Sequence, residues 1–100
     1  MAYPEKQVVS QWLASLQGLP IRLKKMFGCL CVYCDNQPVG WLHGELFSLR
    51  EVGLEYLPDD LRRPGPGDTV QEIPIPLGRR QEPWFPRAVA DTARRRSEQG

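Results

Sequence analysis

The three cysteines of the chain lie within one short stretch, "CLCVYC", at Cys29, Cys31 and Cys34. Grouped thiols can hold a metal ion or carry out thiol chemistry, because the thiolate is both a soft metal ligand and a nucleophile. The single histidine of the chain, His43, is the residue that could complete a zinc ligand set with these cysteines. The first question is therefore whether the surrounding sequence lets these four side chains meet.

The residues around the cysteines favour a strand rather than a metal site. Two strong strand formers separate Cys31 from Cys34, where a metal-binding knuckle needs a turn. Side chains of a strand alternate between faces, so Cys29 and Cys31 would share one face and Cys34 would lie on the other. We therefore expect no cofactor and interpret the thiols as small apolar side chains. A metal site of these cysteines with His43 stays open as an alternative, as does a Cys34–His43 pair for thiol catalysis.

Length and composition restrict the class of protein. One hundred residues form a single domain over 1–100. The net charge of +1 is too small to indicate a nucleic-acid partner, although residues 26–60 are net acidic and the first 25 are net basic. No apolar run reaches the roughly 20 residues that span a bilayer, and the start lacks the pattern of a signal peptide. We therefore expect a cytoplasmic protein with reduced thiols and no membrane partner.

Helices are expected near both ends of the chain. Residues 3–18 carry apolar side chains at helical spacing, and Gly18 suits the left-handed position that ends a helix. Residues 82–100 show the same spacing, with Pro86 in the first turn. The last turn of this second helix holds three consecutive cations, which are Arg94, Arg95 and Arg96. Cations are favoured there by the helix dipole.

Between the helices the sequence predicts an antiparallel meander. Residues 21–53 contain strand-like runs separated by turn residues, and residues 58–68 read as a polar loop. In the run at 69–78, Pro74 and Pro76 would face the same way without an N–H to donate, which predicts a strand at the sheet edge. The predicted fold class is therefore α+β. It is a two-layer sandwich in which the N-terminal and C-terminal helices cover one face of a sheet of about four or five strands.

A short motif precedes the cysteines and carries a family resemblance. Its residues are Lys24, Lys25, Met26, Phe27 and Gly28. A turn at 35–37 and a strand at 46–50 follow it, and the strand at 70–78 leads into the last helix. This order resembles the N-terminal domain of the TfoX/Sxy family of bacterial competence regulators over most of the chain. The resemblance implies a fold related to secretion-chaperone-like α/β sandwiches, a role in transcription regulation and no catalytic residues. The full-length regulators continue into a second, helical domain, so we expect a stand-alone N-terminal domain.

The motif also has a physical interpretation of its own. Met26 and Phe27 are expected to be core anchors between strand and helix, and Gly28 is expected to permit a bulge or a close backbone approach. Lys24 and Lys25 alternate faces, so at least one of them should be solvated.

The leading hypothesis for function is a non-enzymatic regulatory or protein-interaction module with an unidentified protein partner. Two alternatives stay open. The first is nucleic-acid association through the arginines at 94–96 together with Lys24 and Lys25. The second is the thiol or metal protein described above. A homodimer formed through the free side of the sheet is a further alternative for the assembly.

Overall fold

The structure is a computed structural model that describes residues 3–61 and 72–99. Its helices and strands follow one another in the order α1 (Lys6–Ala14), β1 (Ile21–Met26), β2 (Cys29–Cys34), β3 (Gln37–His43), β4 (Leu46–Arg50), η1 (Asp59–Leu61), β5 (Glu72–Ile75), η2 (Leu77–Arg79) and α2 (Trp84–Gln99).

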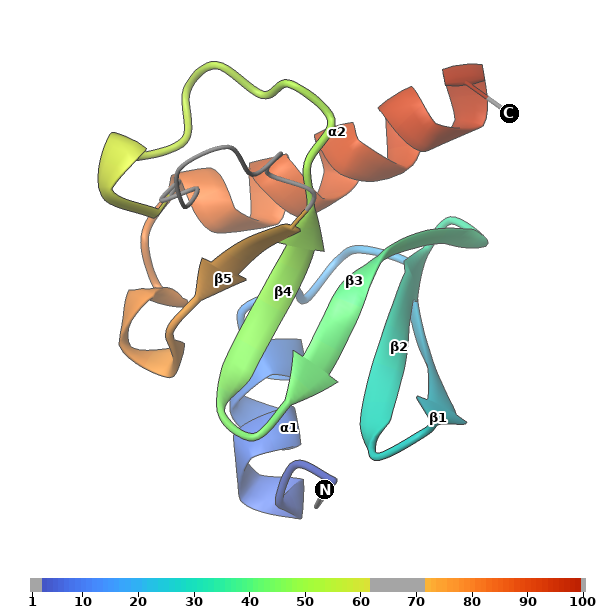
Figure 1. The fold of residues 1–100 in the computed structure, drawn as a ribbon, viewed down its shortest axis with the longest axis vertical. Helices are drawn as coiled ribbons and strands as arrows, with labels where there is room; N and C mark the ends of the chain where they lie inside the picture. Colours follow the sequence, from blue (N-terminus) through green and yellow to red (C-terminus); the bar gives the residue numbers. More distant parts are fainter. Residues whose placement is uncertain (1–2, 62–71, 100) are drawn as a thin grey trace, which may run out of the picture.

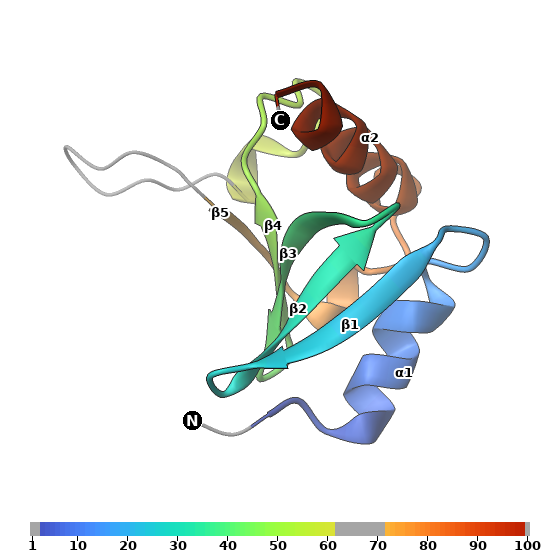
Figure 2. The ribbon, with the colours of Figure 1, turned by 90° about the vertical axis from the view of Figure 1, so that its right-hand side faces the viewer.

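The five strands form one antiparallel sheet in which neighbours in sequence are neighbours in space, β1-β2-β3-β4-β5 (Figure 1). Both α-helices lie on the same side of this sheet (Figure 2). The predicted α+β fold, a two-layer arrangement with a helix at each end of the chain, is thereby confirmed. Among the described residues, no helix is long and apolar enough to cross a bilayer.

The first helix is shorter than the sequence predicts. It begins at Lys6, after Glu5 in the N-cap position with extended backbone, so Pro4 precedes the helix and does not occupy its first turn. It ends at Ala14 and is followed by turns up to Gly18, whose φ of +91° is the left-handed conformation expected for it. Apolar side chains keep the helical spacing in these turns, so the periodicity of the sequence predicts a longer helix than the structure contains.

The turns between strands carry the residues that left-handed backbone requires. Asp35 and Asn36 have φ of 51° and 65° between β2 and β3, as in a two-residue hairpin turn of the type that matches strand twist. The β2–β3 register shifts between Val32 and Tyr33, and Tyr33 is paired with Pro38. Because Pro38 has no N–H to donate, a regular ladder cannot run through this point.

The proline-containing strand lies where the sequence places it. β5 pairs with β4 alone and forms one edge of the sheet, with Pro74 exposed and Ile73 and Ile75 buried. The predicted loop at 58–68 is only partly described. Its first part contains the short helix η1, whereas residues 62–71 lie outside the described residues.

The core lies between the sheet and the helices and is centred on three aromatic rings. Trp12 of α1, Phe47 of β4 and Phe85 of α2 are each fully buried, and their ring centroids lie 5.1–5.4 Å apart. Tilted and edge-to-face rings at this spacing are favourable beyond the area that they bury. Both helices are therefore anchored to the same strand.

The segment after β4 is fastened to α2 by polar contacts. The hydroxyl of Tyr56 donates a hydrogen bond of 2.6 Å to Asp91, and the guanidinium of Arg87 lies 4.4 Å from the Tyr56 ring centroid. Burial, followed by this hydrogen bond, raises the pKa of Tyr56 to about 12. Arg95 donates a hydrogen bond of 2.9 Å to the carbonyl oxygen of Val52. One of the three consecutive arginines of α2 is thus a structural tether.

Gly40 of β3 packs tightly against the backbone of β4, so adding even one methyl group at this position should be severely destabilising. A Cβ atom on Gly40 would lie 2.3 Å from the carbonyl oxygen of Ser48, and a backbone atom cannot rotate out of the way. We expect Gly40→Ala to lower the free energy of unfolding by about 3 kcal/mol or more, the upper part of the range for overpacking. Gly78→Ala is the matched control, because its added Cβ meets nothing within 4 Å. Urea denaturation of both variants checks this, and equal stability would contradict it.

Candidate functional site

The Lys24–Gly28 motif forms the end of the β1–β2 hairpin. The strand residues are Lys24, Lys25 and Met26, while Phe27 and Gly28 form the turn. Gly28 has φ of +76°, a conformation that glycine adopts without strain. This turn holds the Phe27 side chain 93% exposed, and Met26 is 37% exposed. The expectation that Met26 and Phe27 are core anchors is therefore wrong, because the strand ends before Phe27 and the hairpin extends beyond the helices.

The two lysines of the motif point to opposite sides, as strand alternation predicts. Lys25 turns toward the helix layer, where its ammonium lies 5.6 Å from the ring centroid of Tyr3. Lys24 is paired with Cys31 and lies on the opposite side of the sheet. Both lysines are exposed.

An open groove adjoins the hairpin at the start of α1. It has a volume of about 460 Å³ and a mostly apolar lining formed by Tyr3, Pro4, Lys6, Val9, Ser10, Lys25 and Leu30. The residues of this groove that lie outside the motif are not predicted by any pattern in the sequence. They belong to α1 and to the segment before it, and no local signal shows that the start of a helix packs beside a distant hairpin.

The cysteines are distributed as strand alternation predicts. Cys34 is buried in the core cluster between sheet and helices, whereas Cys31 is paired with Trp41 on the side that no described helix covers. Cys29 lies on that same side and is half-buried. The Cys34–His43 thiol pair is therefore contradicted, because His43 shares its face with Cys29 and lines a hollow with it. Within residues 3–61 and 72–99, no set of three or more metal-ligating side chains is close enough to hold an ion.

Burial also controls thiol chemistry. Burial raises the pKa of both Cys31 and Cys34 above the ordinary thiol value. A raised pKa keeps these groups protonated and unreactive at neutral pH.

We call the side of the sheet that no described helix covers the outer face. The side chains that the register places on it include Arg22, Lys24, Met26, Cys29, Cys31, Tyr33, Pro38, Trp41, His43, Leu46, Ser48, Arg50, Glu72 and Pro74. The Nε2 atom of His43 and the hydroxyl oxygen of Ser48 are 2.8 Å apart on this face. A serine–histidine pair can act in acyl transfer, but the side chain of Ser48 is buried and has no free approach to a substrate carbonyl. The pair is therefore a structural contact between β3 and β4.

The arginines at 94–96 do not join Lys24 and Lys25 in one basic surface. The end of α2 and the tip of the β1–β2 hairpin lie at opposite ends of the molecule in both views (Figures 1 and 2). Arg94 contacts Asp91 at 3.2 Å and Glu98 at 3.9 Å, so neighbouring carboxylates offset its charge. Arg95 is held by the carbonyl oxygen of Val52, so two of the three arginines already make contacts within the protein.

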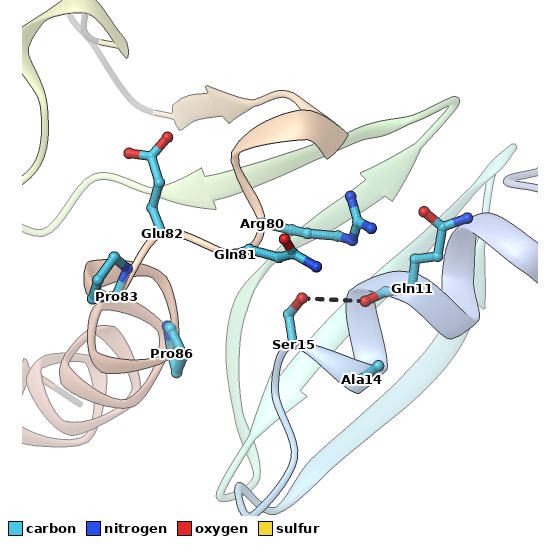
Figure 3. A pocket seen from close by; sticks show the side chains of 8 residues that line it. All are labelled: Gln11, Ala14, Ser15, Arg80, Gln81, Glu82, Pro83 and Pro86. Atoms are coloured by element: carbon cyan, nitrogen blue, oxygen red, sulfur yellow. Dashed lines mark hydrogen bonds between the residues drawn. The ribbon is translucent and has the colours of Figure 1, made fainter.

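A second groove lies between the end of α1 and the start of α2 (Figure 3). It has a volume of about 380 Å³, and the side chain of Arg80 extends across it toward Gln11. Its charged groups already have partners. Arg80 donates a hydrogen bond of 3.1 Å to the carbonyl oxygen of Leu77, and Glu82 accepts hydrogen bonds from Arg79 and Trp84. Arg79 and then Trp84 hold the pKa of Glu82 below its usual value, so this groove offers no free reactive group.

Comparison of the chain with protein-family models, with curated proteins and with solved structures gave no match. The resemblance to the TfoX/Sxy family therefore stays a prediction from the sequence.

The different environments of the cysteines predict their order of reaction. At about pH 8 a thiol reagent should label Cys29 quickly, because it is only half-buried, and should label Cys31 and Cys34 only as the protein unfolds.

The pKa values of Cys31 and Cys34 also predict how stability changes with pH. Because these pKa values are raised in the folded state, the unfolded chain loses the two thiol protons first as pH rises past the ordinary value of 9.0. The free energy of unfolding should therefore fall above that pH.

Timed labelling followed by peptide mass spectrometry checks the order, with Cys29→Ser as the control that removes the fast phase. Rapid labelling of Cys34 in the folded protein would contradict the assignment.

Proposed function

We propose that this chain is a non-enzymatic regulatory module that binds a protein partner through the β1–β2 hairpin and the groove beside it. The observation that carries the proposal is the exposure of Phe27, at 93%, on the tip of a hairpin. A large aromatic side chain gains little from this position in the free protein, because it remains in water. Buried in a partner, the same ring would supply the kind of anchor that dominates interface energies.

The surroundings of Phe27 add contact area. Met26 is exposed beside it, and the apolar groove between Tyr3 and Leu30 lies on the adjoining side of the hairpin. A partner that encloses the tip could fill the groove with its own apolar side chain. The exposed hairpin tip and the groove together offer a partner more contiguous apolar surface than scattered exposed residues would.

Charge near the hairpin favours an acidic partner. Lys24 and Lys25 flank the exposed tip, and Lys6 lines the groove with Lys25. Glu5 lies next to Lys6 in the sequence, and it accepts a hydrogen bond from Gln7. Lysines at the rim would speed the encounter with a partner that carries carboxylates around an apolar pocket. This proposal agrees with the regulatory role expected from the family resemblance, but it rests on the exposed hairpin.

A single substitution at the tip tests the proposal. Phe27→Ser should leave stability within about 0.5 kcal/mol of the original, since the ring is exposed. It should weaken partner binding about 30-fold or more, the loss typical of an interface anchor. Leu13→Ser is the matched control, because Leu13 is an exposed apolar residue of α1 outside the hairpin and the groove.

The measurement is affinity capture from the native cell extract with quantitative mass spectrometry, using all three forms of the protein as bait. The expected result is a protein that is retained by the original and by Leu13→Ser and is lost with Phe27→Ser. Crosslinking from a photoreactive residue at position 27 then identifies the direct contact. Identical captured sets for all three baits would refute the proposal. Phe27-dependent binding to phosphatidylserine vesicles without any protein partner would refute it as well.

A further inference from the structure

The outer face carries two aromatic rings on neighbouring strands, Tyr33 of β2 and Trp41 of β3, and both are half-buried. A guanidinium lies over each ring. Arg22 is 5.3 Å from the centroid of Tyr33, and Arg50 is 5.4 Å from the centroid of Trp41. Aromatic rings and guanidinium planes on a sheet are the surfaces on which unpaired nucleobases stack. On this face the two are layered, because each guanidinium lies over its ring, and an incoming base would stack on the pair.

The charge of the outer face is predominantly positive. Arg22 and Lys24 lie along β1, and Arg50 lies across the sheet on β4, so cations flank the two rings on both sides. Among the described residues paired in the sheet, Glu72 is the carboxylate on this face, and it lies opposite Arg50 on the edge strand β5. The arrangement suits a polyanion whose phosphates pass along the cations while its bases face the rings.

A hollow of about 320 Å³ opens beside Trp41 on the same face. Its described lining consists of Cys29, Trp41, His43 and Glu72. The imidazole of His43 and the carboxylate of Glu72 can exchange hydrogen bonds with the polar edge of a base, and the indole supplies a stacking surface. The hollow therefore combines an aromatic wall with polar groups, as a site for a flipped-out base does.

We propose that the outer face binds single-stranded nucleic acid, with bases stacked on the Arg22–Tyr33 and Arg50–Trp41 pairs and phosphates contacting Arg22, Lys24 and Arg50. A single strand is the ligand because the rings lie on the sheet itself, and the bases of an intact duplex are stacked on one another and cannot reach them. The charge along β1 and the stacked guanidinium planes favour this ligand over a protein segment. This surface shares Lys24 and Met26 with the hairpin assigned to the protein partner, but Phe27 and the groove beside Tyr3 lie outside it, so substitutions at Phe27 and at Arg22 separate the two proposals.

The test uses fluorescence anisotropy of a labelled oligonucleotide of about 12 nucleotides, in DNA and RNA forms, titrated with the full chain. Binding at low ionic strength should weaken as salt rises. Arg22→Gln and Lys24→Gln should each weaken binding and lower the slope of log affinity against log salt by about 0.7. Both residues are exposed, so the fold should survive. Glu72→Gln removes the opposing carboxylate and should strengthen binding.

Loss of stacking is tested separately from loss of charge. Trp41→Leu should weaken binding about ten-fold at every salt concentration, which is the scale of one stacked base, with the salt slope unchanged. Far-UV circular dichroism and thermal unfolding show whether this variant is folded. If it is not, Arg22→Gln and Lys24→Gln, at exposed positions, still test the proposal. Arg94→Gln is the matched control, because it removes an exposed arginine from α2. Phe27→Ser should leave oligonucleotide binding unchanged.

Three results would overturn the proposal. The first is the absence of a salt-sensitive anisotropy change with either single strand at low ionic strength. The second is equal or tighter binding of a duplex of the same length. The third is a loss of affinity with Arg94→Gln that matches the loss with Arg22→Gln, which would place the nucleic acid on α2. A failure of the hairpin experiment has no bearing on these outcomes.

Discussion

The contact among Trp12, Phe47 and Phe85 is the constraint on which the rest of the structure depends. It joins α1, β4 and α2 at one point of the core, with ring centroids 5.1–5.4 Å apart. A helix anchored to an inward-facing residue of a strand must lie on that residue's side of the sheet. Because both helices are anchored to Phe47, both lie on the same side. The one-sided arrangement of the molecule therefore follows from three side chains.

This arrangement determines which polar and aromatic residues stay available. In a sheet covered on both faces, the strands would be apolar throughout, whereas here they alternate. Lys24, Trp41 and Arg50 occupy the outer face because their neighbours along each strand are needed in the core. The same reasoning applies to the hairpin tip. Among the described residues, β1 has no partner strand beyond it in the sheet, and the tip of its hairpin with β2 points away from both helices (Figure 2).

Sequence patterns predicted those features that depend on alternation and backbone chemistry. The alternation of side chains along a strand, which has a period of two residues, predicts the division of the cysteines between faces and supports the fold class. The missing N–H of proline predicts the edge position of the strand that contains Pro74. The placement of Phe27 was wrong for a related reason. The sequence does not distinguish an apolar residue at the end of a strand from one in the turn that follows. It also does not show whether a glycine permits close packing or, as Gly28 does, a left-handed turn. The groove beside Tyr3 was not predictable, because it depends on how α1 packs beside the hairpin.

The arginines show how packing changes the meaning of a charged residue. The run at 94–96 looks like the basic surface of the chain, yet Arg94 contacts two carboxylates and Arg95 holds the backbone at Val52. Arg22 and Arg50 are isolated in the sequence and are held over aromatic rings by the sheet register. A guanidinium held over an aromatic ring is already partly fixed in place, so it loses less side-chain entropy when it contacts a ligand. The positive potential available to a ligand is therefore determined by what each cation contacts, and clustering along the sequence is a poor guide to it.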